Sequence, residues 1–260
     1  MRGCSKSRTN LSTQPDFSRF GYTAQSRMRQ SQQNPLEVPN YAPEEAARYL
    51  HVPLRTIYNW VIGTKGAAPL TTIFSRRPLL LSFKNLVECY VLESLRNVHD
   101  IGMLRVRRSV EELRREKPSK YPLADYALGV RGRTVYLVDD GDVLINLTAG
   151  GQGAFRPILD PFLKRVERPG PGEPAAKLFP FTRKEHIRDP DKAPRFVVID
   201  PSVAFGMPVL VGSRISTAFL LSRKRGGATI PKLAADYGRP EAEIEEAIKL
   251  EEAAEQAKAA

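Results

Sequence analysis

The stretch YAPEEAARYLHVPLRTIYNWVIG (residues 41–63) decides the fold of the first half of the chain. Pro43 and the two glutamates after it are typical of a helix start, because proline suits the first helical turn and anions stabilise the positive end of the helix dipole. The turn His51-Val52-Pro53 separates this helix from a second one, which we expect from Leu54 to about Ile62. Two short helices joined by so tight a turn are organised as a helix-turn-helix.

The second helix carries side chains that suit DNA. Its apolar positions, Ile57 and Trp60, are interpreted as core. Arginine can pair with guanine and asparagine with adenine, whereas threonine and tyrosine hydroxyls suit phosphates. The predicted DNA-binding residues of this helix are Arg55, Thr56, Tyr58 and Asn59. A plain helical hairpin is the alternative, because apolar residues at this spacing occur in many helix pairs.

The same stretch resembles the MerR/excisionase-type DNA-binding domains. The residues that carry the resemblance are Glu45-Ala46-Ala47, Leu50, Val52, Thr56-Ile57 and Trp60. The resemblance implies a winged helix-turn-helix whose recognition helix begins at Pro53 and whose wing lies near residues 67–78. It places Lys65, Arg76 and Arg77 along the DNA backbone. The segment TTIFSRRPLLLSF departs from the family, which often has an arginine-rich wing followed by a tyrosine.

The distribution of charge favours a polyanionic partner for the front of the chain. The 260 residues include 40 basic and 29 acidic side chains, for a net charge of +11. Residues 201–260 hold eight of each, so the whole excess, 32 basic against 21 acidic, lies in residues 1–200. Such an excess indicates DNA, RNA or an acidic protein face as the partner.

Beyond the wing, apolar spacing predicts further helices and a hairpin. Ser82 is placed to cap a helix that carries Leu86, Val87 and Tyr90 at three-to-four spacing. The other expected elements are a helix from Asp100 with Met103, Leu104, Val110 and Leu113 inward, a β-hairpin over RTVYLVDDGDVLINL (residues 133–147) and a helix at about 154–167. The outward arginines of the Asp100 helix form either a second phosphate-facing strip or a solvated face: Arg105, Arg107, Arg108, Arg114 and Arg115.

The run RPGPGEPAAKLFP (residues 168–180) is a linker signal, because proline and glycine interrupt regular structure. Two strands, within RFVVID and MPVLVG, and three helices, at about 216–225, 230–237 and 241–258, follow it. The predicted fold is mainly α with small β-hairpins (α+β), with a winged helix-turn-helix-like domain in front and a short-strand plus three-helix domain behind. The predicted domain bounds are 1–37 for a disordered leader, 38–168 for the helix-turn-helix domain, 169–195 for the linker and 196–260 for the C-terminal domain.

The stretch VAFGMPVLVGSRIST (residues 203–217) raises the question of a phosphate loop. Five residues separate its two glycines, no lysine follows, and Pro208 removes an N–H donor, so the phosphate-loop pattern is not met. We interpret it as scaffold instead. Gly206 and Gly212 supply turns with positive φ, and Pro208 begins a buried strand. Ser213 is placed to cap the next helix, and Arg214 to hydrogen-bond carbonyl groups or Asp200.

Residues 196–252 resemble a small bacterial domain family of antitoxin type, the domain of unknown function four-three-three. That family has a strand, Asp-Pro, then Gly-x-Pro-Val-Ile/Leu-x-Gly-Thr-Arg-Ile and three helices. The matching residues are Asp200, Pro201, Gly206, Pro208, Gly212, Ser213 and Arg214. Met207 departs from the usual Lys or Arg, and Ser213 from Thr. With LSFKNLVECYVLESLR and VLINLTAGGQGAF, the resemblance to two-domain VapB-like antitoxins covers most of residues 40–252.

The last helices also look like a helix-turn-helix, but an acidic one. The would-be recognition helix begins with Glu241, Glu243, Glu245 and Glu246, which phosphates would repel. The same face could meet a basic protein. We therefore assign this unit to oligomerisation or partner binding.

Nothing in the sequence points to catalysis. His51, His99 and His186 are single and widely spaced, without a metal-ligand pattern, and are interpreted as structural. Neither the acidic hairpin tip DDGD (139–142) nor the segment TAGGQGAF (148–155) fits a catalytic or dinucleotide-binding pattern. We expect no catalytic residues, no metal and no cofactor. Two distant cysteines indicate a reducing compartment, and no apolar run approaches the roughly 18–20 residues of a membrane helix, so we expect a cytoplasmic protein.

These patterns lead to three hypotheses about function. The first is a DNA-binding antitoxin of a type II toxin–antitoxin pair, which binds its own operator as a homodimer. The resemblance to VapB-like antitoxins implies a PIN-type ribonuclease toxin as the partner, with Arg214, Arg223 and Arg225 as candidate toxin-binding residues. The second is a stand-alone, ligand-responsive MerR-like regulator. The third, an enzyme that acts on nucleic acid, lacks a catalytic cluster.

Overall fold

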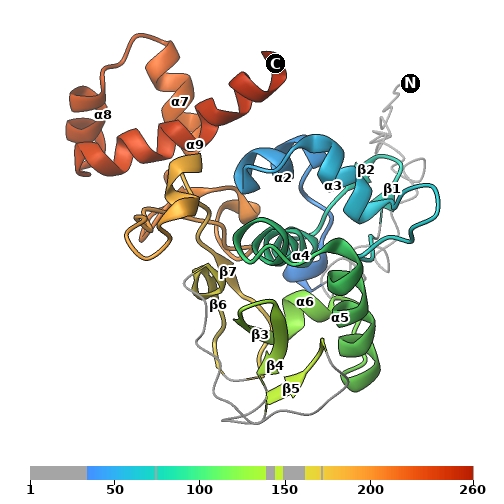
Figure 1. Ribbon diagram of the computed structural model, residues 1–260. Coiled ribbons are helices and arrows are strands. Elements are labelled where there is room, and N and C mark those ends of the chain that lie inside the picture. Colours follow the sequence, from blue (N-terminus) through green and yellow to red (C-terminus); the bar gives the residue numbers. More distant parts are fainter. Residues whose placement is uncertain (1–33, 74, 139–143, 149–161, 171, 260) are drawn as a thin grey trace, which may run out of the picture. The chain divides into compact units, whose positions relative to one another are not determined.

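The computed structural model describes residues 34–73, 75–138, 144–148, 162–170 and 172–259. Pro35–Ala260 form one compact unit of helices and small antiparallel sheets (Figure 1). The predicted class, mainly α with small β-hairpins, is confirmed. Of the predicted leader, residues 1–33 lie outside the described part. Pro35–Glu37 form the 3-10 turn η2, and the Glu37 carboxylate pairs with Lys84 Nζ (3.2 Å).

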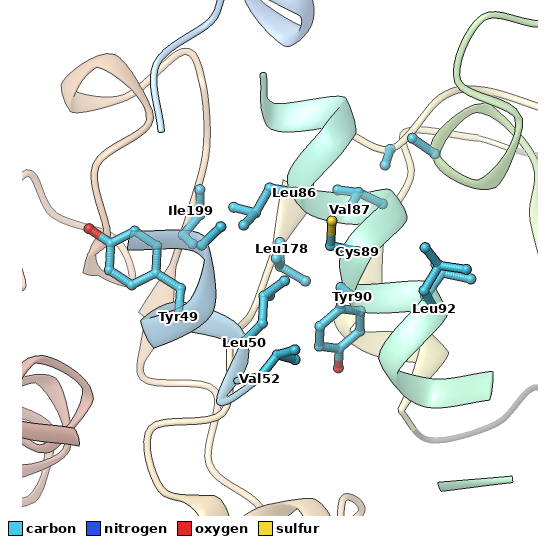
Figure 2. Packing of buried hydrophobic residues seen from close by; sticks show 14 of the residues in the cluster. Tyr49, Leu50, Val52, Leu86, Val87, Cys89, Tyr90, Leu92, Leu178 and Ile199 are labelled. Atoms are coloured by element: carbon cyan, nitrogen blue, oxygen red, sulfur yellow. The ribbon is translucent and has the colours of Figure 1, made fainter. Parts of the chain in front are cut away.

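Helix α4 (Phe83–Glu93) lies at the centre of the core. All its residues are buried, the charged ones included. Ser82 caps it as predicted, because its Oγ accepts a hydrogen bond from the Asn85 N–H (3.3 Å). Figure 2 shows side chains of α4 in one cluster with the end of α2, Leu178 and Ile199. Cys89 is completely buried in this cluster, so its thiol is shielded from solvent.

The predicted helix pair is present as α2 (Pro43–Leu50) and α3 (Leu54–Val61). The Glu45 carboxylate accepts a hydrogen bond from the Ala42 N–H (2.8 Å), which satisfies a donor at the start of α2. The expected wing contains the hairpin of β1 (Ser75–Arg76) and β2 (Leu79–Leu80), which pair antiparallel. A bridge between Tyr41 and Leu81 then joins the end of this hairpin to the start of α2.

After α4, a π-helical turn, η3 (Ser94–Val98), leads to α5 (Met103–Glu116) and the short α6 (Pro122–Asp125). The prediction that Leu104 faces inward is wrong, because its side chain is 66% exposed. Val106 takes the inward place. The residues Met103, Val106 and Val110 follow the 3.6-residue period, and Leu104 falls one residue outside it.

The middle of the chain folds as a three-stranded antiparallel sheet of β3 (Ala127–Arg131), β4 (Thr134–Val138) and β5 (Leu144–Asn146). The predicted β4–β5 hairpin is confirmed by the pair Leu137↔Ile145, while its acidic tip lies outside the described residues. The first strand was not predicted. It turns back on β4 at Gly132, whose φ of 59° suits a residue without a Cβ atom.

The segment from Phe162 differs from the prediction. Instead of the end of a helix at about 154–167, the described residues form the 3-10 turn η4 (Leu163–Arg165) and strand β6 (Val166–Glu167); residues 154–161 lie outside the described part. Strand β6 pairs with β7 (Lys177–Leu178), which lies within the predicted linker 169–195. Tertiary pairing overrides the local helical pattern here, because the Phe179 N–H donates to the Arg165 carbonyl oxygen (2.9 Å).

The C-terminal part has the predicted short strands and three helices. Strands β8 (Val197–Val198) and β9 (Val209–Leu210) pair antiparallel, and a bridge from Ile199 to Leu178 joins them to β7. The remaining elements are the 3-10 turns η5 (Lys184–Arg188) and η6 (Ala204–Gly206) and the helices α7 (Thr217–Arg225), α8 (Ile230–Tyr237) and α9 (Glu241–Ala259). None of the described helices combines the length and the apolar character that a membrane crossing requires.

One buried arginine cross-links the middle and C-terminal segments. Arg165 has no exposed surface, and its guanidinium donates hydrogen bonds to four backbone carbonyl oxygens: Phe179 (2.8 Å), Ala193 (3.1 Å), Pro180 (3.2 Å) and Pro194 (2.7 Å). The same guanidinium stacks over the Phe181 ring, 4.3 Å from its centroid. Burial lowers the pKa of Arg165 to about 10, which leaves the group charged at neutral pH.

We expect Arg165→Met to lower the free energy of unfolding by about 3 kcal/mol or more. The substitution fills similar space but leaves several buried carbonyl oxygens without a donor, at roughly 1–3 kcal/mol each. Urea denaturation followed by circular dichroism measures the change. The matched control is Arg195→Met. Arg195 is exposed and stacks over Phe179 at 5.6 Å, so its loss is expected to cost about 1 kcal/mol or less. Equal losses from both variants would contradict this account of Arg165.

Candidate functional site

The outer face of α3 carries the predicted DNA-binding residues. Ile57 and Trp60 are buried as predicted and fix the helix to the core. On the opposite side Arg55 is exposed, and Thr56, Tyr58 and Asn59 are partly exposed. Arg55, Tyr58 and Asn59 fall at positions i, i+3 and i+4, so they share one face of the helix. This face presents a guanidinium, a phenol and an amide together, a set that can donate and accept hydrogen bonds.

The turn between α2 and α3 is held from the C-terminal half. His51 ends α2 in the left-handed conformation (φ 54°), and its Nε2 lies 2.7 Å from the Phe181 carbonyl oxygen. Burial lowers the pKa of His51, so the neutral imidazole is favoured. The histidine therefore fixes the angle at which α3 leaves α2, in agreement with a structural role.

The basic residues predicted for the DNA backbone follow α3 along the chain. Lys65 lies at the exposed tip of a tight turn, which is closed by two hydrogen bonds between Thr64 and Ala67 (2.9 and 3.0 Å). Arg77 is exposed at the turn of the β1–β2 hairpin. The backbone of Arg76 belongs to β1, but its side chain is outside the described part. The distal end of the site thus offers at least two accessible cations.

Helix α5 packs against the segment that joins α3 to the hairpin. Arg107 donates to the Ala68 carbonyl oxygen (2.5 Å), and Arg114 donates to that of Leu70 (2.7 Å). These two arginines therefore act as internal ties and do not form an outward strip. Arg105 and Arg108 remain exposed beside them, which keeps open a smaller phosphate-facing strip.

A buried polar network supports this joining segment from below. Glu88 of α4 is fully buried, and its carboxylate accepts hydrogen bonds from the Thr71 hydroxyl and from the Leu123 N–H (3.4 Å). Asn85 donates to Thr71 Oγ1 and to the Thr72 carbonyl oxygen (2.8 Å each). Burial raises the pKa of Glu88 to about 8. The position of the segment after α3 thus depends on a carboxyl group that titrates near neutral pH.

Helix α2 is also tied to the C-terminal helices. Glu251 of α9 is buried, and it accepts a hydrogen bond from the Thr217 hydroxyl at the start of α7 (2.5 Å). The other carboxylate oxygen lies 3.3 Å from Arg48 of α2. A single buried carboxylate therefore joins three helices, one of which belongs to the candidate DNA-binding motif.

The family-motif residues of the C-terminal part form a turn-rich scaffold, as predicted. Gly206 (φ 77°) and Gly212 (φ 71°) have positive φ, and Pro208 immediately precedes β9. Asp200 accepts hydrogen bonds from the N–H and hydroxyl of Ser202 (2.8 and 2.6 Å) within the turn that begins at Pro201. The prediction that Ser213 caps α7 is wrong. Its hydroxyl donates to the Leu210 carbonyl oxygen (2.9 Å), and the residue before α7 is Ser216.

A hollow of about 370 Å³ opens beside this motif. Its floor is apolar and consists of Phe179, Val198, Val203, Val209 and Val211. Three charged side chains line it as well: Lys177, Asp200 and Arg214. Arg214 is exposed there, so the structure brings this predicted partner-binding residue to the rim of an apolar depression.

The candidate residues Arg223 and Arg225 lie elsewhere. Both are exposed near the C-terminal end of α7, a helix of nine residues or roughly 13 Å, whereas Arg214 precedes its N-terminal end. Arg223 pairs with Asp236 of α8 (3.5 Å). Four residues before it, Phe219 is 50% exposed and meets the Tyr237 ring edge-on, with 6.2 Å between centroids. The structure therefore separates the three arginines into two surfaces.

The acidic face predicted for α9 is largely used within the chain. Glu246 is buried, accepts a hydrogen bond from the Thr182 hydroxyl and pairs with Arg183 (2.7 Å). Glu245 pairs with the same arginine (3.0 Å), and Glu243 pairs with Arg239 (2.7 Å). Glu241 is exposed. The prediction of four outward carboxylates was wrong for Glu246, whose partners Thr182 and Arg183 are distant in the sequence, and for Glu243, which pairs with Arg239 one helical turn before it.

Two exposed phenylalanines are new candidates, Phe205 and Phe219. Composition and motif matching gave no sign of them, because exposure depends on which turns the tertiary structure imposes. A search of the described residues finds no group of three or more histidine, cysteine, aspartate or glutamate side chains placed to hold a metal ion. The segment DDGD and all but the first residue of TAGGQGAF lie outside the described part.

Comparisons with known proteins agree with the two resemblances in part. Residues 197–249 match the family described as "Protein of unknown function (DUF433)". The chain is 26% identical over 236 residues to "Putative antitoxin VapB45" of Mycobacterium tuberculosis, covering 82% of this chain and 94% of that protein. It is 27% identical over 222 residues to "Uncharacterized protein Rv2308" of the same organism, covering 80% and 88%.

A solved structure shares the fold. The crystal structure of Rv2018 from Mycobacterium tuberculosis superposes with a TM-score of 0.56 at 20% identity, covering 82% of this chain and 99% of that chain. Residues 197–249 thus match the DUF433 family, and the chain as a whole is similar to a protein named as a putative VapB-type antitoxin.

We expect the stability of this protein to depend on pH through Glu88. Its folded pKa, about 8, lies above the ordinary value of 4.5, so the folded state binds the proton more tightly than the unfolded state does. The stabilisation is complete below pH 4.5 and is lost as the pH rises through 8, with a slope of up to about 1.4 kcal/mol per pH unit. Glu88→Gln removes this dependence. Urea denaturation at pH 5, 6.5 and 8 measures the difference between the two proteins.

The control for Glu88→Gln is Glu111→Gln, at an exposed position of α5. Its difference from the unmodified chain should stay flat across the same pH range. A flat difference for Glu88→Gln as well would show that the folded state does not raise the pKa of the buried carboxyl.

Proposed function

We propose that this chain is a DNA-binding antitoxin of a type II toxin–antitoxin pair, which represses its own operon through α2 and α3 and neutralises a PIN-type ribonuclease. The observation that carries the proposal is the face of α3, where Arg55, Tyr58 and Asn59 point outward from a helix anchored by Ile57 and Trp60. The similarity to a relative named as a putative antitoxin supports the antitoxin role.

In the proposed complex, α3 enters the major groove, which admits an α-helix and presents a distinct pattern for each base pair. Arg55 reads a guanine and Asn59 an adenine, while the hydroxyls of Thr56 and Tyr58 bind phosphates. Lys65, Arg76 and Arg77 bind the DNA backbone beyond the helix. Arg105 and Arg108 of α5 are close enough in the fold to extend this contact, since α5 packs on the segment after α3.

Operator binding by such a motif calls for two copies of the chain. Recognition helices of dimeric helix-turn-helix proteins read half-sites about one helical turn apart, roughly 34 Å. We therefore propose a homodimer on a two-fold symmetric operator in the cytoplasm.

The toxin-binding face that we propose lies on α7 and α8. Phe219 and Arg223 are four residues apart on one face of α7, and Tyr237 of α8 lies against Phe219. Exposed aromatic residues beside an arginine are the combination enriched in protein interfaces. A PIN-type nuclease holds Mg²⁺ with acidic residues, so Arg223 or Arg225 would find carboxylates there. Arg214 lies on a different surface, at the apolar hollow.

For DNA binding, we expect Arg55→Ala to weaken operator affinity by about 1–3 kcal/mol and to relax the preference at one base pair. The comparison variant is Arg77→Ala, which removes a phosphate contact. It should weaken binding to all sequences alike. It should also reduce the slope of the logarithm of the binding constant against the logarithm of the salt concentration by about one. Fluorescence anisotropy on a panel of operator variants at several salt concentrations measures both effects. Sequence-independent losses from both variants would mean that α3 is not the recognition helix.

For toxin binding, the tagged chain is purified from its host and the co-eluting small protein is cloned. We expect this protein to arrest growth when produced alone and to be harmless when co-produced with the unmodified chain. Arg223→Glu should lower the affinity for it at least about tenfold, or about 1.4 kcal/mol, because a carboxylate would then face carboxylates. Arg188→Glu, an exposed reversal on η5, is the control and should still rescue growth. A co-eluting protein that does not arrest growth when produced alone would contradict the antitoxin proposal.

A further inference from the structure

The most exposed large apolar side chain among the described residues is Phe205, with 90% of its surface accessible. It lies in the turn η6, directly after Val203 and Ala204. Both Ala204 (φ 46°) and Phe205 (φ 56°) adopt the left-handed conformation, which costs a residue with a Cβ atom roughly 1–2 kcal/mol. The Phe205 ring is thus exposed to solvent by a turn whose backbone conformation is energetically unfavourable.

The turn that presents Phe205 is rigidly supported. The Tyr41 hydroxyl donates to the Gly206 carbonyl oxygen (2.9 Å), and the Asn40 side chain donates to that of Phe205 (2.5 Å). Gly206 has no room for a Cβ atom, because the Tyr41 hydroxyl occupies that space. These contacts span 165 residues of sequence, so the position of the ring is set by the tertiary fold. Strain that the surrounding structure maintains in this way is a recognised sign of function.

The apolar hollow described above adjoins this turn. Val203, two residues before Phe205, forms part of its floor together with Phe179 and Val209. Its volume of about 370 Å³ exceeds the roughly 150 Å³ in which an apolar cavity can hold a benzene ring. An exposed phenyl ring and a depression able to receive one therefore lie side by side on the same surface.

The charges at this surface also have both signs. Arg214 and Lys177 line the hollow together with Asp200, and Lys177 is already paired with Glu167 (2.7 Å). A surface with a protrusion, a depression and charges of both signs has the features that a self-complementary contact between two copies needs. In such an isologous contact, each residue pair occurs twice.

We propose that this surface pairs two copies of the chain, with Phe205 of each copy seated in the hollow of the other and Arg214 of each facing Asp200 of the other. Buried aromatic anchors of this kind supply most of the binding free energy of an interface. The pairing closes on itself, so it produces dimers and not open chains. It forms without DNA or toxin, and it rests on the proposed function only in supplying an interface for the homodimer proposed there.

The first test is the dimer dissociation constant, measured by analytical ultracentrifugation of the full chain without DNA. We expect the unmodified chain to sediment at twice its mass of 29.1 kDa. Phe205→Ala should raise the dissociation constant at least about 30-fold, the equivalent of 2 kcal/mol for one central anchor. The control is Leu104→Ala on α5, which removes another exposed apolar side chain and should change nothing. Circular dichroism verifies that each variant is folded.

A mixing experiment tests the geometry. Arg214→Glu alters an exposed residue at the rim and should weaken its own dimer. In a mixture with Phe205→Ala, the intact ring of the first variant meets the intact hollow of the second, so one of the two contacts is restored. We expect the mixed dimer to be tighter than the weaker of the two variants' own dimers, because it keeps one ring in an unaltered hollow.

Three results would overturn the proposal. They are a monomeric unmodified chain, a Phe205→Ala dimer of undiminished affinity, and a mixture that forms no mixed dimer. If Phe205→Ala remained dimeric and lost only its toxin, the ring would belong to the toxin interface instead.

Discussion

The buried guanidinium of Arg165 is the interaction on which the rest of the structure depends. Its hydrogen bonds reach carbonyl oxygens at Phe179 and Pro180 and at Ala193 and Pro194, so one side chain fixes two separate stretches of backbone to its own segment. These stretches are short and irregular and cannot satisfy their own carbonyl groups by regular secondary structure. The Phe181 ring stacks on the guanidinium, and the carbonyl group of Phe181 contacts His51 at the helix-turn-helix. The direction in which α3 projects is therefore linked through His51 and Phe181 to Arg165.

Arg165 is one of several arginines used in this way. Arg168 donates to the carbonyl oxygens of Ala124 and Tyr126, Arg107 and Arg114 hold the segment after α3, and Arg239 donates to Val211. Arginine suits the task because its planar fork carries five donors and remains charged when it is buried. Part of the net charge of +11 therefore belongs to arginines that stabilise the fold. The cations open to a polyanion are the smaller set on the exposed face, such as Arg55, Lys65 and Arg77.

The sequence predicted the features that depend on neighbouring residues. Proline and a carboxylate mark the start of α2, Ser82 caps α4, and the glycines of the DUF433 motif have positive φ as expected. Leu104 and Ser213 were misjudged on local grounds, but the other failures involve partners far away in the chain. Glu246 faces inward because Thr182 and Arg183, 64 and 63 residues away, donate hydrogen bonds to its carboxylate. The predicted α-helix does not continue after Phe162, because the backbone of residues 165–167 hydrogen-bonds with residues 177–179. Phe205 is exposed because Tyr41 and Asn40 hold its turn. No local pattern encodes such pairings.

The contacts of Glu251 limit the movement of α2 relative to α7 and α9. Glu251 is buried between Arg48 of α2 and Thr217 of α7, and separating these helices would leave its carboxylate unpaired in the interior. The loss of one partner of a buried ion pair typically costs about 3–5 kcal/mol, a large share of the stability of an ordinary domain. The first helix of the candidate DNA-binding motif therefore cannot shift independently of α7 and α9. A partner that displaced α9 would have to move α2, and a partner that bound without displacing α9 would leave the geometry of α3 unchanged.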